Sequence, residues 1–306
     1  MTDTRADAVD LIDPPSALQR DLSVAGLVSM NAVWTALPGG RTNQVWRVED
    51  ESGRRVVKLY AKSGGTPLFR NDPKAEAMVL EAIKGRNLAP EPIFSGDLPS
   101  GAVLVYAHQR GSPWRSGLAP VAHLLRSLHD LPLHADLQPM PSASDDARSL
   151  MAQTLDILSQ IPSHDAQPLR ALQPDGVTFP SGPRRLLHGD PVPDNLICPA
   201  GEPEGMPVLI DWQCPAVGDP LHDIALFLSP AMQQVGRGQP LTPDERKAFL
   251  TAYDDPATEV RLAALQPILH WRMAAYCLWK LTRSAPDRAY EAAMRAEIAA
   301  LQALSA

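Results

Sequence analysis

The hydrophobic pattern of this 306-residue chain changes about a third of the way along, and this change most constrains the fold. Before it, short alternating segments predict five strands, at 32–37, 44–48, 55–60, 92–94 and 102–106. Pro73 begins a single helical pattern in this part, with Ala77, Leu80 and Ile83 on one face. From about residue 117 onward the apolar residues mostly recur with a helical period. We therefore expect an α+β protein, in which an antiparallel sheet with one helix precedes a larger helical part.

The same change of pattern divides the chain into two expected lobes. Residues 1–108 would form the N-terminal sheet lobe, in which residues 1–14 are a mobile tail, and residues 109–306 would form the helical lobe. Within the second lobe, residues 256–304 should be largely helical, with a kink or interruption at Pro267. A cleft between two such lobes is a usual place for a ligand.

Composition excludes several classes of protein. The chain has 28 Lys and Arg against 35 Asp and Glu, a net charge of −7, which argues against a general nucleic-acid binder. The three cysteines, at 198, 214 and 277, are odd in number and form no C-x-x-C pair, as expected in a reducing compartment. The polar, acidic N-terminus is no signal peptide, and no apolar run could span a membrane, so we expect a cytoplasmic protein.

The richest segment for chemistry is HGDPVPDNLICPAGEPEGMPVLIDWQCPAVGDPLHD, residues 188–223. Asp190 and Asn195 stand five residues apart in a loop with apolar flanks, and Asp211 ends a short apolar strand. Two strand-like triplets, 196–198 and 208–210, flank a Gly- and Pro-rich turn and predict a hairpin. This hairpin would return Asp211 to the neighbourhood of Asn195.

These residue types suit phosphoryl transfer from ATP. Mg²⁺ prefers hard oxygen ligands, which Asn195 and Asp211 could supply. Asp190 could accept the proton of an attacking hydroxyl. Upstream, Lys58 ends a strand-like run and could hold the phosphates, while Glu76 on the following helix could fix that cation. Each residue taken alone has a plain structural explanation, but their order and element types together favour the catalytic interpretation.

The sequence resembles the aminoglycoside phosphotransferase / choline kinase family, small-molecule kinases with a bilobal, protein-kinase-like fold, from about residue 20 to 285. The resemblance is carried by PGGRTNQVWRV (38–48), VVKLY (56–60), KAEAMVLEAI (74–83), VAHLLRSLHDLP (121–132), LLHGDPVPDNLI (186–197), VLIDWQ (208–213) and GDPLHDIA (218–225). A protein kinase would more typically show H-R-D and D-F-G, whereas this chain has H-G-D and D-W-Q.

The resemblance implies a role for each matching residue. Asp190 would be the catalytic base, Asn195 and Asp211 the Mg²⁺ ligands, and Lys58 with Glu76 the pair that holds the ATP phosphates. The remaining ATP contacts would come from Gly39, Gly40 and Asn43 in a phosphate loop and from Tyr106 and His108 at the hinge. His188, Asp219 and Asp223 would support the catalytic loop.

The acceptor would be the hydroxyl of a small polar or cationic molecule. Trp271, Tyr276 and Trp279 fall within roughly 140° on one predicted helix and could cage a quaternary ammonium, although such a stripe can equally be core. Trp212 is a further pocket candidate because it follows Asp211 directly. Choline- or ethanolamine-like, thiamine-like, amino-sugar and aminoglycoside acceptors all stay open, as does the oligomeric state.

Two alternatives come from other classes of protein. The chain could be a nucleotide-binding module without turnover, although it retains every catalytic residue type. It could also be a metal-dependent phosphohydrolase that uses His188, His222, Asp223 and Asp211, since His and Asp can bind metals. That hypothesis would leave Lys58 without a task.

Overall fold

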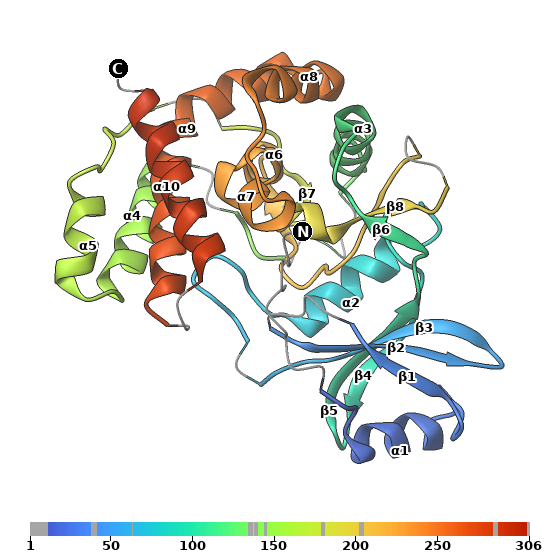
Figure 1. Cartoon of the computed structure of the whole chain (residues 1–306). Helices are drawn as coiled ribbons and strands as arrows, with labels where there is room; N and C mark the ends of the chain where they lie inside the picture. Colours follow the sequence, from blue (N-terminus) through green and yellow to red (C-terminus); the bar gives the residue numbers. More distant parts are fainter. Residues whose placement is uncertain are drawn as a thin grey trace, which may run out of the picture. The chain divides into compact units, whose positions relative to one another are not determined.

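The computed structural model describes residues 12–37, 42–62, 64–133, 137, 140–143, 146–178, 181–201, 205–283 and 287–304. The chain divides into two compact units, an N-terminal unit of residues 1–110 and a C-terminal unit of residues 111–306 (Figure 1). The N-terminal unit is built on a sheet, and the C-terminal unit is mainly helical. The expected fold class, an antiparallel sheet region followed by a helical region, is confirmed.

The N-terminal unit contains one five-stranded antiparallel sheet, in the order β1-β2-β3-β5-β4. Its strands are β1 (Val33–Ala36), β2 (Gln44–Asp50), β3 (Gly53–Leu59), β4 (Pro92–Leu98) and β5 (Gly101–Ala107). Helix α2 (Pro73–Ala82) lies between β3 and β4 in the sequence. Its start follows the usual capping chemistry, since the Asp72 carboxylate accepts the N–H groups of Lys74 and Ala75 and Pro73 occupies the first turn.

A second helix of this unit, α1 (Ser16–Val24), was missed by the sequence analysis. It has nine residues and only two buried side chains, Leu18 and Leu22, so its local signal is weak. Both leucines pack in a core cluster with sheet residues such as Trp46 and Val48. A helix this short is marginal by itself, and packing against the sheet stabilises it.

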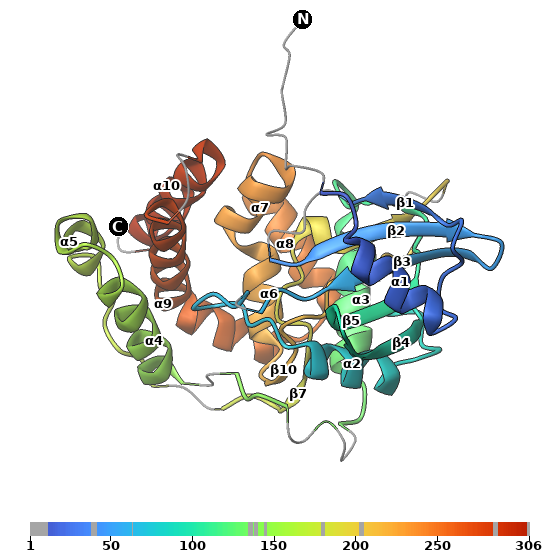
Figure 2. The same cartoon turned by 90° about the horizontal axis from the view of Figure 1, so that it is seen from below.

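The C-terminal unit is built mainly from helices. They are α3 (Leu118–His129), α4 (Ala147–Ser159), α5 (Ser163–Arg170), α6 (Leu221–Leu228), α7 (Pro230–Arg237), α8 (Pro243–Tyr253), α9 (Pro256–Leu281) and α10 (Arg288–Ala303). The long helix α9 packs along α10 and along α4, as Figures 1 and 2 both show. Helix α7 packs against α10 and also against the 3-10 turn η2 (Pro193–Asn195).

Two small sheets carry the segment that the sequence singled out. Strands β6 (Gly111–Pro113), β8 (Leu196–Pro199) and β9 (Val208–Leu209) form one of them, in which β8 and β9 are the expected hairpin. Strands β7 (Arg185–Leu187) and β10 (Ala216–Gly218) form the other. The chain therefore enters and leaves the segment 188–215 through paired strands, which fixes both of its ends.

The sequence predicted a kink or an interruption at Pro267, and of these the interruption is absent. Helix α9 runs through Pro267 as one 26-residue element, because a proline removes only one backbone hydrogen bond and the flanking Leu265 and Ile268 are buried. Burial of this face compensates for the local loss. Tertiary packing thus overrides the helix-breaking tendency of a single residue.

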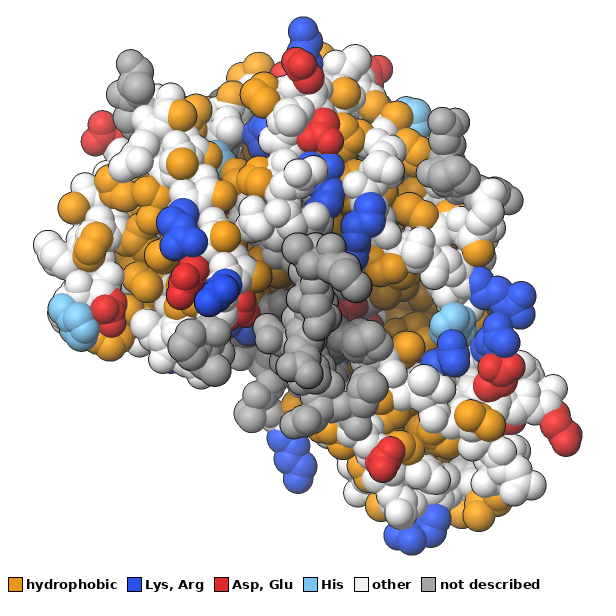
Figure 3. All heavy atoms as spheres, viewed as in Figure 1, with side chains coloured by type: hydrophobic (Ala, Val, Ile, Leu, Met, Phe, Trp, Pro, Cys, Tyr) orange, Lys and Arg blue, Asp and Glu red, His pale blue; other side chains and the backbone are white. Residues whose placement is uncertain are grey.

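The surface gives two further facts. On the face drawn in Figure 3, basic and acidic side chains lie interspersed among hydrophobic and other polar ones. Among the residues that the structure describes, no helix is both long and apolar enough to cross a membrane.

Candidate active site

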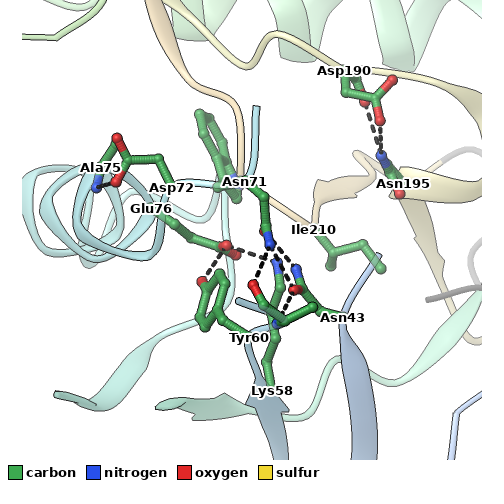
Figure 4. A network of polar contacts seen from close by, with 12 residues as sticks. Asn43, Lys58, Tyr60, Asn71, Asp72, Ala75, Glu76, Asp190, Asn195 and Ile210 are labelled. Carbon is green, nitrogen blue, oxygen red and sulfur yellow. Dashed lines mark hydrogen bonds and ion pairs between the residues drawn. The ribbon is translucent and has the colours of Figure 1, made fainter. Parts of the chain in front are cut away.

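One group of candidate residues is a buried ion pair in the N-terminal unit. Lys58 lies near the end of β3, a strand with neighbours on both sides, and Glu76 lies in the first turn of α2. The Nζ atom of Lys58 is 2.7 Å from Oε2 of Glu76, and these side chains are only 2% and 1% exposed (Figure 4). The structure therefore brings together the two residues that the sequence analysis paired.

Tyr60 is a third member of this group, and the sequence analysis did not identify it. Its hydroxyl donates to the same Oε2 atom of Glu76, and Lys58 Nζ lies 5.0 Å from the centre of its ring (Figure 4). The spacing in the sequence could have identified it, since Lys58 and Tyr60 stand two residues apart and so share one face of the strand. Glu76 thus accepts from two donors, which holds the lysine in one position.

Asn43 belongs to a separate polar contact in the same unit. Its side chain exchanges hydrogen bonds with that of Asn71, at 2.8 and 2.9 Å, and its Oδ1 accepts the N–H of Ala61 at 3.0 Å. The pair connects the residue just before β2 with Asn71, which lies just before α2 (Figure 4). Gly39 and Gly40, the other expected phosphate-loop residues, lie outside the described residues.

The two expected hinge residues differ in their surroundings. Tyr106 is buried within β5, where its partners across the sheet are Val56 and Pro92. His108 follows β5, and its backbone N–H donates to the carbonyl of Arg54 at 3.2 Å. Burial, and then the nearby arginines, lower the pKa of His108, so its imidazole is neutral at pH 7.

A second group of candidate residues lies in residues 188–195 of the C-terminal unit, the segment expected to be the catalytic loop and called so below. Within it, Nδ2 of Asn195 donates to the backbone carbonyl of Asp190 at 2.9 Å and to its carboxylate at 3.2 Å (Figure 4). The N–H of Asp190 donates in turn to Nδ1 of His188 at 3.2 Å. The side chains of Asp190 and Asn195 are thereby held against each other by the fold of the loop.

The geometry of this loop requires glycine at position 189. Gly189 has a φ of +82°, and a Cβ atom there would lie 2.1 Å from the carbonyl oxygen of Cys214. Side chains are excluded both by this backbone contact and by the left-handed conformation. The H-G-D form of the motif therefore follows from the close approach of two chain segments.

Asp223 on α6 fixes the start of the loop. Its carboxylate accepts the backbone N–H groups of His188 and Gly189 at 2.8 and 2.9 Å, as well as Nε2 of His129 at 3.1 Å. Nδ1 of His129 then contacts the Tyr253 hydroxyl at 2.9 Å. Although burial acts in the opposite direction, the hydrogen bond and charge of His129 help to lower the pKa of Asp223. His129 and Tyr253, which are 94 and 30 residues from Asp223 in the sequence, were not identified by the sequence analysis.

Asp211 follows the β8–β9 hairpin, as expected. The N–H of Ile210, the residue before it, donates to the carbonyl of Asn195 at 2.9 Å, and the Ile210 carbonyl lies 3.0 Å from Nε2 of His188. Asp211 itself has a positive φ of 62°, an uncommon conformation for an aspartate. These bonds attach the Asp211 turn to both ends of the catalytic loop.

The charges of this loop are only partly compensated. Burial and, next in size, the neighbouring carboxylate of Asp211 raise the pKa of Asp190 to about 8. The hydrogen bond from Asn195 acts in the opposite direction. Two carboxylates and an amide oxygen gathered in this way form an oxygen-rich set of the kind that Mg²⁺ prefers.

Asp219 has a structural partner that the sequence did not reveal. Arg261 of α9 binds its carboxylate through Nε and Nη2, at 2.5 and 3.0 Å, and Asp219 Oδ1 also accepts the N–H of Leu221 at the start of α6. A Cβ atom on Gly182 would collide with this pair. Asp219 thus joins α6 to α9 and braces the helix that carries Asp223.

The four aromatic residues do not share one exposed face. Trp212 and Trp271 are fully buried, and their indole N–H groups donate to the carbonyls of Leu209 and Leu169. Tyr276 is also buried and stacks with the half-buried Trp279, with their ring centres 6.1 Å apart. Trp271 and Trp212 therefore belong to the core of the C-terminal unit, in line with the core-stripe interpretation.

The phosphohydrolase hypothesis finds no support in the geometry. Asp223 accepts the backbone N–H groups of His188 and Gly189 and contacts His129, while Nε2 of His188 contacts the Ile210 carbonyl. Across the part of the chain that the structure describes, no cluster of three or more His, Cys, Asp or Glu side chains is arranged to hold a metal ion.

Comparison with known proteins identifies the class. A family model described as "Phosphotransferase enzyme family" matches residues 33–265, and the chain therefore belongs to this family of enzymes. The expectation of a small-molecule kinase with a protein-kinase-like fold is confirmed. No protein of curated function matches the sequence significantly.

Several solved structures share the fold. An ethanolamine kinase from Plasmodium vivax has a TM-score of 0.65 at 14% sequence identity, and the match covers 92% of this chain and 86% of the kinase chain. A choline/ethanolamine kinase family protein from Mesorhizobium loti has a TM-score of 0.64 at 18% identity, covering 94% and 93%. A spectinomycin phosphotransferase in complex with ADP and spectinomycin has a TM-score of 0.59 at 14% identity, covering 95% and 100%.

Proposed function

We propose that this enzyme transfers the γ-phosphoryl group of ATP, with Mg²⁺, to a hydroxyl group of a small molecule. The observation that carries the proposal is the catalytic loop, where Asn195 holds Asp190 and the Asp211 turn is hydrogen-bonded to Asn195. Phosphoryl transfer needs a base, hard oxygen ligands and a fixed cation, and these side chains together with Lys58 supply that set.

The oxygen donors fit a divalent cation. Asp190 and Asp211 repel each other electrostatically, as the raised pKa of Asp190 indicates, and a bound Mg²⁺ would offset that repulsion. Asn195 Oδ1 and the Asp211 carboxylate would hold the ion, since Asn195 uses its Nδ2 on Asp190 and keeps its oxygen for a ligand. When bound, the ion would neutralise charge on the phosphates.

The remaining roles follow from the chemistry of each side chain. Asp190 would accept the hydroxyl proton of the acceptor, and Lys58, oriented by Glu76 and Tyr60, would bind phosphate oxygens. Asp223 would act as a positioning residue through the backbone N–H groups of the loop. Most of the acceleration would come from positioning and electrostatics rather than from a covalent intermediate.

For the acceptor we propose a small amino alcohol or an amino-sugar derivative. The support is the fold shared with proteins described as an ethanolamine kinase, a choline/ethanolamine kinase family protein and a spectinomycin phosphotransferase. The buried Trp271 gives no support to an exposed cage for a quaternary ammonium on α9. Recognition by other polar groups is therefore the better basis for choosing compounds.

The test is ADP release from Mg²⁺-ATP with a panel of choline, ethanolamine, other amino alcohols, thiamine, amino sugars and aminoglycosides. Turnover with one class of acceptor, absent in Asp190→Ala and absent without Mg²⁺, is the expected result. ATP binding with no turnover on any acceptor would favour the nucleotide-binding module. Failure to bind ATP at all would refute the proposal.

A further inference from the structure

A small cavity in the C-terminal unit lies apart from the residues assigned above. It is lined by residues of α6, α8, α9 and α10, helices that Figure 1 shows in the orange and red part of the chain. Its volume is about 30 Å³, more than the roughly 10–15 Å³ that one water molecule needs. The polar side chains at its wall include Arg246, Gln266, His270, Arg272 and Glu297.

Arg272 is the unusual member of this wall. Nη1 donates to Oε1 of Gln153 at 2.9 Å, but Nε is shielded from solvent and has no hydrogen-bond partner among the described residues. Burial alone lowers the pKa of this arginine to about 10, with no carboxylate acting against it. A buried donor left unpaired in this way calls for a ligand that the protein atoms do not supply.

Arg246 adds a second cation. It lies in α8, donates through Nη1 to the carbonyl of Leu228 at 2.8 Å, and is also partly removed from solvent. Among the described residues neither Arg246 nor Arg272 forms an ion pair. Both guanidinium groups remain charged at pH 7 because even lowered arginine pKa values lie well above it.

Glu297, the acidic residue of the cavity wall, forms hydrogen bonds with other groups. Glu297 accepts the hydroxyl of Ser229 and the N–H of Ala231 on one oxygen, and Nδ1 of His270 lies against the other. These contacts tie α10 to α7 and α9. The wall therefore carries two arginines against one carboxylate, and that carboxylate is held by other donors.

We propose that this cavity binds the carboxylate group of a small molecule, with Arg272 as its main partner. The Nε–Nη2 edge of a guanidinium matches the two oxygens of a carboxylate, and such paired bonds are among the strongest in proteins. A planar carboxylate also suits the small volume better than a tetrahedral phosphate does. The carboxylate could belong to a free organic acid or to the acceptor itself.

The first test measures thermal unfolding of the full chain without ATP or Mg²⁺, while sodium acetate replaces sodium chloride at constant ionic strength. We expect Tm to rise by about 2–4 °C once acetate fills most of the sites. Lys58→Met should keep this rise, because its site is the phosphate site of the N-terminal unit. Because this test measures no turnover, its result does not depend on whether the protein has the proposed kinase activity.

Variants locate the effect. Arg272→Met should lose the acetate-dependent rise and be no less stable than the wild type without acetate, since it removes an unneutralised buried charge. Lys247→Met, which removes an exposed cation next to Arg246 on α8, should keep the rise. If Arg272→Met does not fold, Arg272→Lys keeps the charge but lacks the planar pair of donors, and should show a smaller rise.

A second arm separates the two sources of the carboxylate. If acetate has no effect but Arg272→Met lowers kcat/KM about tenfold or more for a hydroxy acid, and not for the matching alcohol without a carboxylate, the acceptor supplies the group. A Tm rise with phosphate or sulfate, and none with acetate, would overturn the carboxylate assignment. Equal responses of the wild type and the Arg272 variants in both arms would overturn the site altogether.

Discussion

Lys58 and Asp190 are both ionisable groups in sheltered positions, but the protein treats them in opposite ways. Lys58 sits on a regular strand with a carboxylate 2.7 Å away, and a tyrosine hydroxyl shares that carboxylate. Asp190 sits in an irregular loop between paired strands, where the charge that affects it most, that of Asp211, has the same sign. One group is neutralised by the folded chain, and the other is held near a like charge.

This difference separates stability from function. A buried pair such as Lys58–Glu76 is costly to break, because removing one partner leaves the other charge buried without a counter-charge. A cluster of like charges is costly to keep unless a cation binds to it. We therefore expect substitutions that remove a charge from the Lys58–Glu76 pair to lower stability, and removal of the Asp190 charge to abolish activity without lowering stability.

The largest expected effect tests the loop. Asp190→Asn should lower kcat by about 10³-fold or more, because general-base assistance and placement of the acceptor hydroxyl are both lost. Urea unfolding without Mg²⁺ above pH 8, where Asp190 is ionised, should show a free energy of unfolding equal to or above that of the wild type, since one of two repelling carboxylates is removed. A clear loss of stability would show that the charge of Asp190 is compensated within the protein.

The second prediction tests the ion pair. Glu76→Gln should lower the free energy of unfolding by about 3–5 kcal/mol, because Lys58 would stay buried without its carboxylate. The double variant Lys58→Met/Glu76→Gln should recover part of this loss, which urea unfolding of the single and double variants measures as a coupling energy. Additive effects would mean that the pair does not act as a unit.

The third prediction concerns the backbone of the loop. Gly189→Ala should cost about 1–3 kcal/mol and most of the activity, because the new Cβ meets the Cys214 carbonyl in a left-handed conformation. Gly201→Ala is the matched control: its φ is +83°, similar to that of Gly189, but no atom of the residues that the structure describes lies within 4 Å of the added Cβ. The control should show backbone strain alone and nearly full activity. Equal loss in both variants would exclude the close approach as the cause.

The smallest expected effect comes from a partly exposed counterpart of Lys58–Glu76. Arg237 and a backbone N–H lower the pKa of Glu245 to about 2, so this carboxylate stabilises the fold above pH 4.5 and loses that contribution as the pH falls toward 2. The stability difference between the wild type and Glu245→Gln should be small above pH 4.5 and should shrink on acidification. Urea unfolding at several pH values measures it, and a difference that grows on acidification would contradict the assignment.

Local chemistry explains why much of the architecture was predictable. Strand alternation and turn residues define β2 to β5, and Pro73 with its capping Asp72 defines the start of α2. The β8–β9 hairpin follows from two apolar triplets around a Gly- and Pro-rich turn. The short helix α1 and the continuous α9 were not predicted, because both depend on burial against partners distant in the sequence.

The sequence by itself determined the order of the elements, the motif residues Lys58, Glu76, Asp190, Asn195 and Asp211, and the class of chemistry they suit. Only the tertiary structure decided which other side chains complete these groups. Tyr60 shares Glu76, His129 and Tyr253 extend from Asp223, and Arg261 binds Asp219. The tertiary structure also decided that Trp212 and Trp271 are core residues and that Arg272, in the wall of a cavity, has an Nε without a hydrogen-bond partner among the described residues. The physical reason is that periodicity and turns are properties of neighbouring residues, whereas charge compensation depends on which distant faces the fold buries together.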